Sequence, residues 1–487
     1  MRRRARDCEG ALCSCLLGRT TISNFDVGAW AQAQFGQCVL GDLRRTKRLV
    51  QMAQQVANNP SASLPDQTET WGDLKAAYRL FDNSQVTFTA VAEQHWQQTR
   101  QQSPGRYLIL GDTTELDFGG LRTIQGAGPT GNGSGLGFLL HTGLVVNAQT
   151  QAVAGVAGAT IHYRQRKKPH QQRPNASQRV THPNRESLVW GRVIDAVGPP
   201  PTGVEWLHVF DRGADDFEVC CHLLENRCSW LIRAAKMTRK VVNAAGQQLP
   251  LKEALSELKI AGRYELCLRS RPGQAARTAK LEVRTGTISL PQPRFVSPYV
   301  KQVGHTSIAM QVVWVQEINP PRGVQPIQWV LYTSLPVNTF EEAWQIIEYY
   351  EARWLIEEYH KALKTGCATT RHELRTASRL EALVGLLTVV AVRLLALKSA
   401  ARAEPDRPAA EVVPRLWLHM IRAARKNMRQ PQNLTIYQFY RELAKLGGFL
   451  GRKHDGEPGW ITIWRGWEKL NTLVRGAQLA KTMKNSG

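Results

Sequence analysis

The nine cysteines of the chain form no CxxC pair, and the only close neighbours are Cys13 with Cys15 and Cys220 with Cys221. A structural zinc site normally takes its ligands from two close pairs, which this spacing does not provide. The sequence therefore argues against a zinc-stabilised fold. Scattered cysteines are typical of reduced thiols in a cytoplasmic protein.

Long apolar runs are also missing. The strongest, Ala382 to Val392, has 11 residues, whereas a membrane-spanning helix needs about 20. We expect a buried helix there and a soluble, cytoplasmic protein with no membrane partner. Residues 1–25 carry four arginines before a short apolar stretch, but Cys and Ser interrupt it and no clear cleavage site follows. A disordered arm or an incorrectly assigned start is expected rather than a signal peptide.

Acidic residues are scarce, because 40 Asp and Glu stand against 63 Lys and Arg, giving a formal charge of +23. Such an excess favours a polyanionic partner, since neutralising phosphates releases condensed counterions and drives binding. A basic protein that is merely soluble, or one held on anionic membranes, would have a similar composition. Nucleic acid is the interpretation that the placement of the charges favours.

The order of periodic segments predicts an α/β architecture with helical domains at both ends. Residues 26–104 have apolar residues at helical spacing, and residues 105–398 alternate strands with helices around two strand-end acids. Within that region, about 236–338 is β-rich and indicates an inserted antiparallel sub-domain. Residues 399–487 return to a helical pattern. No internal repeat or low-complexity tract interrupts the chain.

Two further segments have a distinct character. The polar stretch Arg164–Arg185 is basic and contains three prolines, so a mobile loop is expected there. Near the end, Trp464, Trp467, Leu470 and Leu473 fall on one apolar helical face. Such a face suits a helix that binds a partner copy, and it suits an internal core equally well.

A cluster of cations near the N-terminus indicates a surface for phosphates. Arg44, Arg45 and Arg48, together with Lys47, lie within one or two turns of a predicted helix. A solvated helix face would look similar. The DNA interpretation is preferred because of the overall charge.

Two aspartates each follow a buried strand. Asp112 comes after Tyr107–Leu110, and Asp211 comes after Trp206–Phe210. A single Asp in this position is more often a turn former or a helix cap. Two of them on neighbouring central strands, facing an acid on a later helix, would instead make a cluster of oxygen ligands.

That later acid is predicted on a helix over residues 350–364. With Tyr350 at zero and about 100° per residue, Arg353 lies at about 300°, Glu357 at about 340° and Lys364 at about 320°. One acid and two cations therefore share a stripe. An amphipathic helix with an Arg353–Glu357 ion pair on a solvated face would give the same pattern.

Together, Asp112, Asp211 and Glu357 suit hard cations, either Mg²⁺ or Mn²⁺. Two ions about 4 Å apart could activate water or a 3′-hydroxyl and stabilise the leaving oxygen of a phosphodiester. Arg353 and Lys364 could grip phosphates beside the scissile bond, and Tyr350 could hydrogen-bond to one.

The spacing Tyr350-x2-Arg353-x3-Glu357-x6-Lys364 resembles the YREK motif of the insertion-sequence-four family of bacterial DDE transposases, and within that family the transposon-five type. The resemblance covers the chain from about Trp30 to Met483. Further matching stretches are Leu40-Gly-Asp-Leu-Arg-Arg-Thr, Gly111-Asp-Thr-Thr, Val209-Phe-Asp-Arg, Glu317-Ile-Asn-Pro-Pro-Arg-Gly and Leu446-Gly-Gly-Phe-Leu. The ordered set is far more specific than the four-residue motif.

The resemblance implies an RNase H-like core in which Asp112, Asp211 and Glu357 hold the metal ions. It implies nicking at the transposon ends, hairpin formation and opening, and strand transfer into target DNA. It also implies that a base near the cleaved end flips out and stacks on Trp329, with Trp354 near the hairpin. Without the resemblance, Trp329 would be read as a core residue of a strand.

The remaining implications concern binding. Arg233 matches a DNA-contacting arginine, although a structural ion pair would also explain it. The N-terminal helices, with Arg44, Arg45 and Arg48, would bind the inverted repeats of the element. The C-terminal helices would join two protomers into a homodimer in which each protomer cuts the end bound by the other. Such an enzyme is expected at the bacterial nucleoid.

Two other functions fit parts of the pattern. A catalytically silent regulator would keep the DNA grip without the chemistry, but all three acids and the N-terminal basic helix are present. Another RNase H-like nuclease, such as a resolvase, would cut without joining and would not need the long β insertion.

Overall fold

The computed structural model describes residues 26–119, 123–166, 174–268, 270, 275–411, 413–425, 433–452 and 455–485. The arm expected over residues 1–25 and the middle of the basic loop expected over Arg164–Arg185 lie outside these ranges. The chain divides into two compact units. The helical unit comprises Met1–His95 and Glu358–Gly487, and the sheet unit comprises Trp96–Glu357.

The sheet unit is built on one mixed twelve-stranded sheet, which confirms the expected α/β class. Its first part has the order β4–β3–β1–β5–β6, in which β3 is antiparallel to β1 and β4, while β5 is parallel to β1 and β6. The bounds are β1 Gly105–Asp117, β3 Gly135–Asn147, β4 Val153–His162, β5 Val204–Phe210 and β6 Ser229–Arg233. A short strand, β2 (Gly128–Thr130), pairs with β3.

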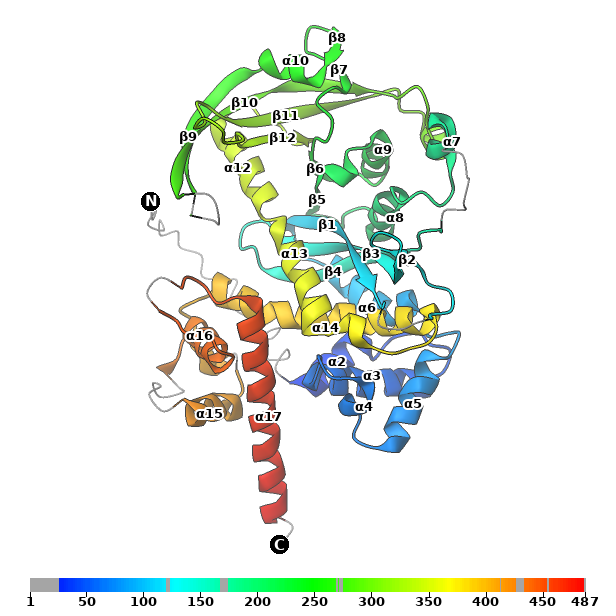
Figure 1. Ribbon diagram of the computed structural model, residues 1–487, viewed down its shortest axis with the longest axis vertical. Helices are drawn as coiled ribbons and strands as arrows, with labels where there is room; N and C mark the ends of the chain where they lie inside the picture. The colour runs from blue at the N-terminus through cyan, green and yellow to red at the C-terminus, as the bar shows by residue number, and fades with distance from the viewer. Residues whose placement is uncertain are drawn as a thin grey trace. The chain divides into compact units, whose positions relative to one another are not determined.

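The β-rich insertion continues this same sheet. Strand β12 pairs antiparallel with β6, with Leu331 opposite Arg233, and β11, β10, β7 and β8 follow, while β9 pairs with β10. The bounds are β7 Lys240–Val242, β8 Gln248–Pro250, β9 Lys259–Leu268, β10 Arg277–Pro291, β11 Ser307–Glu317 and β12 Gln328–Thr333, with short helices α10 Leu251–Ser256 and α11 Pro298–Val303. The expected antiparallel strands are therefore present as an extension of the core sheet (Figure 1).

The two faces of the sheet carry different layers. Helices α8 (Leu188–Val197) and α9 (Phe217–Glu225) bury Ile109, Trp206 and Phe210 against one face. Successive side chains of a strand alternate in direction, so the residues between these point to the opposite face. There, Arg106 donates a hydrogen bond of 3.2 Å to the Tyr349 hydroxyl on α12 (Phe340–Glu351).

The helix expected over residues 350–364 is broken in the structure. Helix α12 ends at Glu351 and α13 spans Trp354–Lys361, followed by a π-helical turn over Ala362–Gly366. Between them Leu355 N bonds to Ala352 O and Ile356 N to Arg353 O, which are tighter i to i−3 contacts. A uniform 100° wheel therefore does not hold along the whole segment.

The helical unit joins the two ends of the chain. Its helices are α2 Val27–Phe35, α3 Leu43–Asn58, α4 Leu64–Gln67, α5 Trp71–Phe81, α14 Ala377–Ala403, α15 Arg415–Ala424, α16 Ile436–Leu446 and α17 Trp460–Asn485; α6 (Phe88–Arg100) and α13 cross the division between the units. The buried guanidinium of Arg393 on α14 lies 5.3 Å from the Trp30 ring and 5.9 Å from the Trp467 ring. The same arginine therefore contacts an N-terminal and a C-terminal helix.

The structure tests two predictions about apolar helical segments. The run Ala382 to Val392 is buried in α14, as expected. On α17, Trp464, Trp467 and Leu470 are buried, whereas Leu473 is 40% exposed. Trp467 and Leu470 belong to a core with α15 and α16, so this part of the face serves an internal core. In the described part of the chain no helix is both long and apolar enough to cross a membrane.

Candidate active site

The register between β1 and β5 brings two of the predicted acids together. Leu110 is aligned with Val209 in the parallel ladder, and Asp112 and Asp211 each lie two residues further on. Both side chains therefore leave the sheet on the same face, on neighbouring strands that are about 4.8 Å apart. Leu110 and Val209 stand outside the core under α8 and α9, so this is the face on which α12 lies.

The two aspartates differ in their local backbone. Asp211 directly follows β5, and its Oδ1 accepts a 2.8 Å hydrogen bond from Gly213 N in the 3₁₀ turn Arg212–Ala214. Asp112 lies inside β1, because that strand continues to Asp117 in a ladder with β3. The prediction that Asp112 closes its strand was therefore wrong, although the parallel pairing does end before it.

A glycine next to Asp112 lets the two strands approach. A Cβ on Gly111 would stand 2.3 Å from Cε1 of Phe210, the residue just before Asp211. Such a contact is far below van der Waals distance, and Phe210 is locked in the buried core. Glycine at this position thus fixes the packing behind both acids.

The third acid, Glu357, is linked to Asp112 by Arg353, which contacts both. Arg353 Nη2 donates a 2.7 Å hydrogen bond to Glu357 Oε1, and its Nη1 lies 3.5 Å from Asp112 Oδ2. The guanidinium is 17% exposed, the Asp112 side chain 23% and the Glu357 side chain 51%. The i,i+4 ion pair considered from the sequence is present, and it stands beside Asp112.

The electrostatics also link all three carboxylates. Burial raises the pKa of Asp112 above its ordinary value, and the negative charges of Asp211 and Glu357 raise it further. The Thr113 amide and Arg353 oppose this rise. Burial lowers the pKa of Arg353, but Tyr350, Asp112 and Glu357 outweigh it and raise the pKa overall. A cation placed between the carboxylates would offset this repulsion.

The donor set suits a hard divalent cation. Only carboxylate oxygens converge here, and the absence of thiol or imidazole ligands among them matches the preference of Mg²⁺ and Mn²⁺. Asp112 Oδ2 and Glu357 Oε1 already share one positive group, the Arg353 guanidinium. Within the described ranges, no group of three or more His, Cys, Asp or Glu side chains is arranged so that it could hold a metal ion. The carboxylates fit the ion in chemistry, with a guanidinium between two of them.

Two of the expected DNA contacts share the face of the acids. Trp329 lies on β12 two residues before Leu331, and Arg233 on β6 is directly opposite Leu331. Opposite residues of an antiparallel pair project from the same side. Trp329 and Arg233 are both half-buried, and Arg233 Nη2 lies 3.4 Å from Gln328 O. Neither residue is enclosed in the core.

The other expected contacts lie along α12 to the π-helical turn. Tyr350 is 8% exposed at the end of α12, and Trp354 is 42% exposed at the start of α13. Lys364 is half-buried in the π-helical turn, in the part of the chain that belongs to the helical unit.

The N-terminal arginines are partly committed to neighbours. Arg44 pairs with Asp42 at 2.8 Å, and Arg48 pairs with Asp73 at 2.8 Å. Arg45 Nη1 donates to Leu40 O at 2.8 Å. The Arg44 side chain is 90% exposed and is the most accessible of the three to a ligand. The pairing of Arg48 could not be read from the sequence, because Asp73 lies on another helix.

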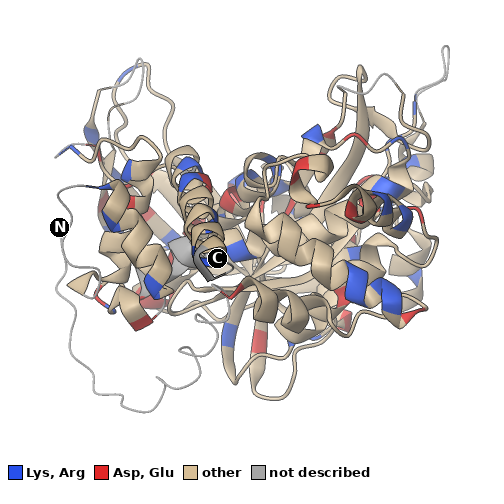
Figure 2. Cartoon of the chain, turned by 90° about the horizontal axis from the view of Figure 1, so that it is seen from below, with Lys and Arg blue, Asp and Glu red and all other residues tan. Residues whose placement is uncertain are grey.

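Basic residues are not confined to this helix. Figure 2 shows Lys and Arg spread over helices and loops of the chain, interspersed with Asp and Glu. The large positive charge is thus distributed over many elements, as expected for a protein that contacts an extended polyanion.

Three family models match successive parts of the chain. A transposase DNA-binding model matches residues 27–86, a transposase DDE domain model matches residues 205–393, and a transposase Tn5 dimerisation domain model matches residues 389–487. These matches define the class of protein: a DNA transposase, which binds DNA, forms dimers, and carries out metal-dependent DNA cleavage and strand transfer. The chain belongs to the Tn5-like DDE transposases, which confirms the family predicted from the sequence.

The DDE match contains Asp211 and Glu357, whereas Asp112 precedes its first residue. The DNA-binding match contains Arg44, Arg45 and Arg48.

Proposed function

We propose that this transposase moves its element by cut and paste. It nicks the DNA at each transposon end, closes and reopens a hairpin there, and joins the free end to target DNA. The proposal is supported by the β1–β5 register, which puts Asp112 and Asp211 at matching positions of neighbouring strands, and by the contacts of Arg353 with both Asp112 and Glu357.

The catalytic core is RNase H-like in this proposal. The strand order β4–β3–β1–β5–β6 supports it, since an antiparallel trio leads into a parallel one. The first acid lies on the central strand β1 and the second follows its parallel neighbour β5. Glu357 comes from a later helix, after the insertion.

Asp112, Asp211 and Glu357 would hold two Mg²⁺ or Mn²⁺ ions, which when bound supply the Lewis acidity for attack on the phosphodiester. The side chains around them position the DNA. Arg353 has donors that can turn from the carboxylates to a phosphate, and Tyr350 and Lys364 would hold the same strand. The low exposure of Arg353 favours a fixed direction for its donors.

Trp329 and Trp354 would hold the strand as the hairpin forms. Trp329 shares the face of the acids, is half-buried and presents part of its ring, which suits stacking by an unpaired base. Trp354 is exposed next to Arg353. Arg233 would bind the backbone beside Trp329.

Arg44, Arg45 and Arg48 would bind the inverted repeat, with Arg44 free to meet a phosphate once it leaves Asp42. Two protomers would each bind one end and cut the other, through the segment that matches the dimerisation family.

The test uses full-length protein, Mg²⁺ and a plasmid that carries the element's own ends. We expect Asp112→Asn, Asp211→Asn and Glu357→Gln each to abolish nicking while end binding persists. Glu205→Gln is the matched control, because Glu205 lies on β5 with the parity of Asp211, and its partners are Arg106, in a half-exposed ion pair, and the Ser229 hydroxyl. Cleavage retained by one of the three variants would remove that residue from the site, and retained cleavage in all three would refute the proposal.

A further inference from the structure

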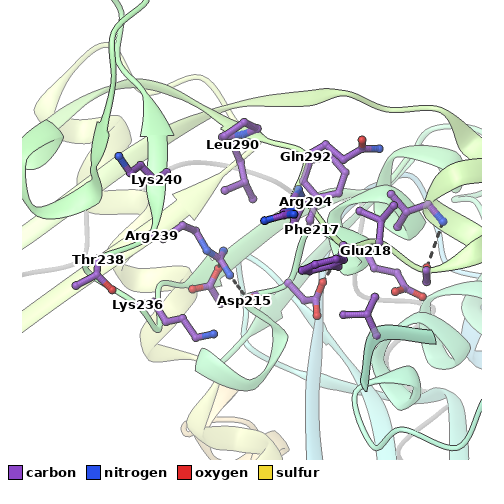
Figure 3. Close-up of a pocket in the computed structure, with 18 of the residues that line it drawn as sticks. Asp215, Phe217, Glu218, Lys236, Thr238, Arg239, Lys240, Leu290, Gln292 and Arg294 are labelled. Carbon is purple, nitrogen blue, oxygen red and sulfur yellow. Dashed lines mark hydrogen bonds and ion pairs between the residues drawn. The ribbon is translucent and has the colours of Figure 1, made fainter. Parts of the chain in front are cut away.

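A cavity of about 570 Å³ opens in the sheet unit, away from the residues assigned above. Its walls come from the segment after β5, Asp215–Glu218, from the turn that leads into β7, Lys236–Lys240, and from the chain between β10 and α11 (Figure 3). Val180, on the short helix α7 (Ala176–Thr181) within the segment expected as a loop, and Arg185 after it also line the cavity. The cavity thus collects basic residues from three distant parts of the sequence.

Two ion pairs form a rigid, neutral inner wall. Asp215 is 1% exposed and pairs with Arg239, whose Nη2 also donates to Asp215 O at 2.7 Å. The Asp215 carboxylate accepts a further 2.7 Å bond from Ala235 N. Arg185 pairs with Glu218, both with side chains no more than 14% exposed. These four charges cancel locally and hold the walls in place.

The rim carries cations without such partners. Lys236, Lys240 and Arg294 are exposed, and in the described ranges none of them forms an ion pair with a carboxylate. Figure 3 shows Lys236 and Lys240 on one side of the Arg239–Asp215 pair and Arg294 on the other. The remaining acid, Asp216, caps α9 by accepting from Glu218 N at 3.0 Å. Three positive charges around a concave mouth attract a polyanion.

The rim also offers an aromatic surface. Phe295 lines the cavity and is 42% exposed, and the Arg294 guanidinium carbon lies 5.2 Å from its ring centre. Exposed rings beside cations are the elements with which proteins bind unpaired nucleotides, because the base stacks while the cation meets the phosphate. A small inorganic anion would use the cations but not the ring.

The cavity lies within reach of Asp211. Asp215 lies four positions after Asp211, and four Cα–Cα steps span at most about 14 Å even when extended. A DNA strand advances about 3.4 Å per nucleotide along the helix axis, so this distance corresponds to about four nucleotides. Phe217, Leu290 and Val300, which line the cavity, belong to the core under α8 and α9. A strand with its reacting phosphate at Asp211 therefore has to pass the end of β5 to place a nearby phosphate at the cavity.

We propose that this cavity binds a DNA strand within about four nucleotides of the reacting phosphodiester, with Lys236, Lys240 and Arg294 on its phosphates and Phe295 against an unpaired base. The inference rests on the proposed function, because that function puts the reacting phosphate at Asp211. The strand comes either from donor DNA flanking the transposon end or from target DNA, and the same chemistry serves both.

The first experiment measures DNA binding by the full chain without divalent cation, so that catalysis plays no part. The variant is K236Q/K240Q/R294Q, and the control is K252Q/K259Q/R322Q, which removes the same charges from exposed positions outside the cavity. The probes are a duplex transposon end that continues into flanking DNA and one that stops at the cleavage point. Affinity is followed from about 50 to about 200 mM salt.

If the strand is donor flank, the cavity variant should lower the slope of log K against log salt by about 2–3 on the extended probe only. If it is target DNA, both probes should bind as the control does, and strand transfer of pre-cut ends into a plasmid should fall at least tenfold relative to the control. Phe295→Ala should weaken the same step most where the DNA carries unpaired bases. Equal behaviour of cavity variant and control in binding and in strand transfer would overturn the proposal.

A result in which the cavity variant loses binding of inorganic phosphate or dTMP, yet handles both DNAs normally, would also overturn it and assign the cavity to a small anion. Because the binding arm needs no metal and no cleavage, its outcome is separate from that of the acid substitutions above.

Discussion

Replacing Arg353 with methionine removes the guanidinium beside Asp112 and Glu357 while keeping an unbranched side chain of similar length. The carboxylates would then repel one another without a counter-charge. Exposed ion pairs contribute about 0–1 kcal/mol, and breaking a fully buried pair costs about 3–5 kcal/mol. Because Arg353 and Asp112 are mostly buried but Glu357 is half-exposed, we expect the free energy of unfolding to fall by about 1–2 kcal/mol at pH 7.

This loss should depend on pH with a defined sign. The folded-state pKa of Asp112 lies above its ordinary value of 3.8, so its ionisation disfavours the folded state as pH rises through that raised pKa. Without Arg353 the pKa rises further. The difference between wild type and Arg353→Met should therefore be small below the raised pKa of Asp112, where that carboxyl is protonated, and should reach its full size above it.

Thermal unfolding of both proteins, with and without Mg²⁺, measures this directly. In the absence of the ion we expect the melting temperature of Arg353→Met to be lower by roughly 2–6 °C at pH 7. Mg²⁺ should raise it more in the variant than in wild type, because the ion and the guanidinium neutralise the same carboxylates. Identical melting curves across pH, together with equal responses to Mg²⁺, would refute the reasoning.

Three further predictions follow from individual contacts. Trp329→Ala should slow hairpin formation more than the first nick in a gel assay of end cleavage, and equal slowing of both steps would contradict the stacking role. Gly111→Ala should destabilise the sheet unit by about 1–3 kcal/mol in denaturant unfolding, because the new methyl meets the Phe210 ring; unchanged stability would mean that the ring moves freely. His208 is fully buried, and burial lowers its pKa from 6.5 to about 3, so its stabilising contribution is present above pH 6.5 and is lost as pH falls. Between pH 8 and pH 5, the free energy of unfolding of His208→Leu should therefore rise by about 2 kcal/mol relative to that of wild type. A difference that does not change with pH would contradict this prediction.

The sequence was informative where a strand could be recognised by its own residues. Tyr107–Leu110 and Trp206–Phe210 are continuous apolar runs, and the acids after them could be placed by reading along the chain. The core helices α8 and α14 could be placed in the same way, because the local spacing of their apolar residues indicates that they are buried. The two strands determine where the aspartates lie on the sheet.

Pairing between distant segments could not be read in this way. Nothing in Ser229–Arg233 specifies β12, about 100 residues later, as its neighbour, so the insertion was expected as a sub-domain rather than as part of one sheet. The extension of β1 beyond Asp112 depends likewise on its ladder with β3. Strand partners are chosen by tertiary packing, which a single strand does not encode.

The break between α12 and α13 had no sequence signal either. No glycine or proline occurs from Phe340 to Lys364, so the run reads as one helix. The cavity at Arg239 was missed for a related reason, because its walls come from segments as far apart in the sequence as Val180 and Val300. Only the basic character of the loop ending at Arg185 hinted at it.

Because β12 pairs with β6, the sheet itself fixes the distance between the residues that these strands carry. Trp329 and Asp211 are separated only by hydrogen-bonded strands, with no hinge or linker in the path. The span from Asp211 to the Trp329 ring is then set by strand spacing and by the register of Leu331 against Arg233. A slip of one residue in that register would turn Trp329 to the far side of the sheet. In the mechanism we propose, a change in strand pairing alone would then separate cleavage from hairpin closure.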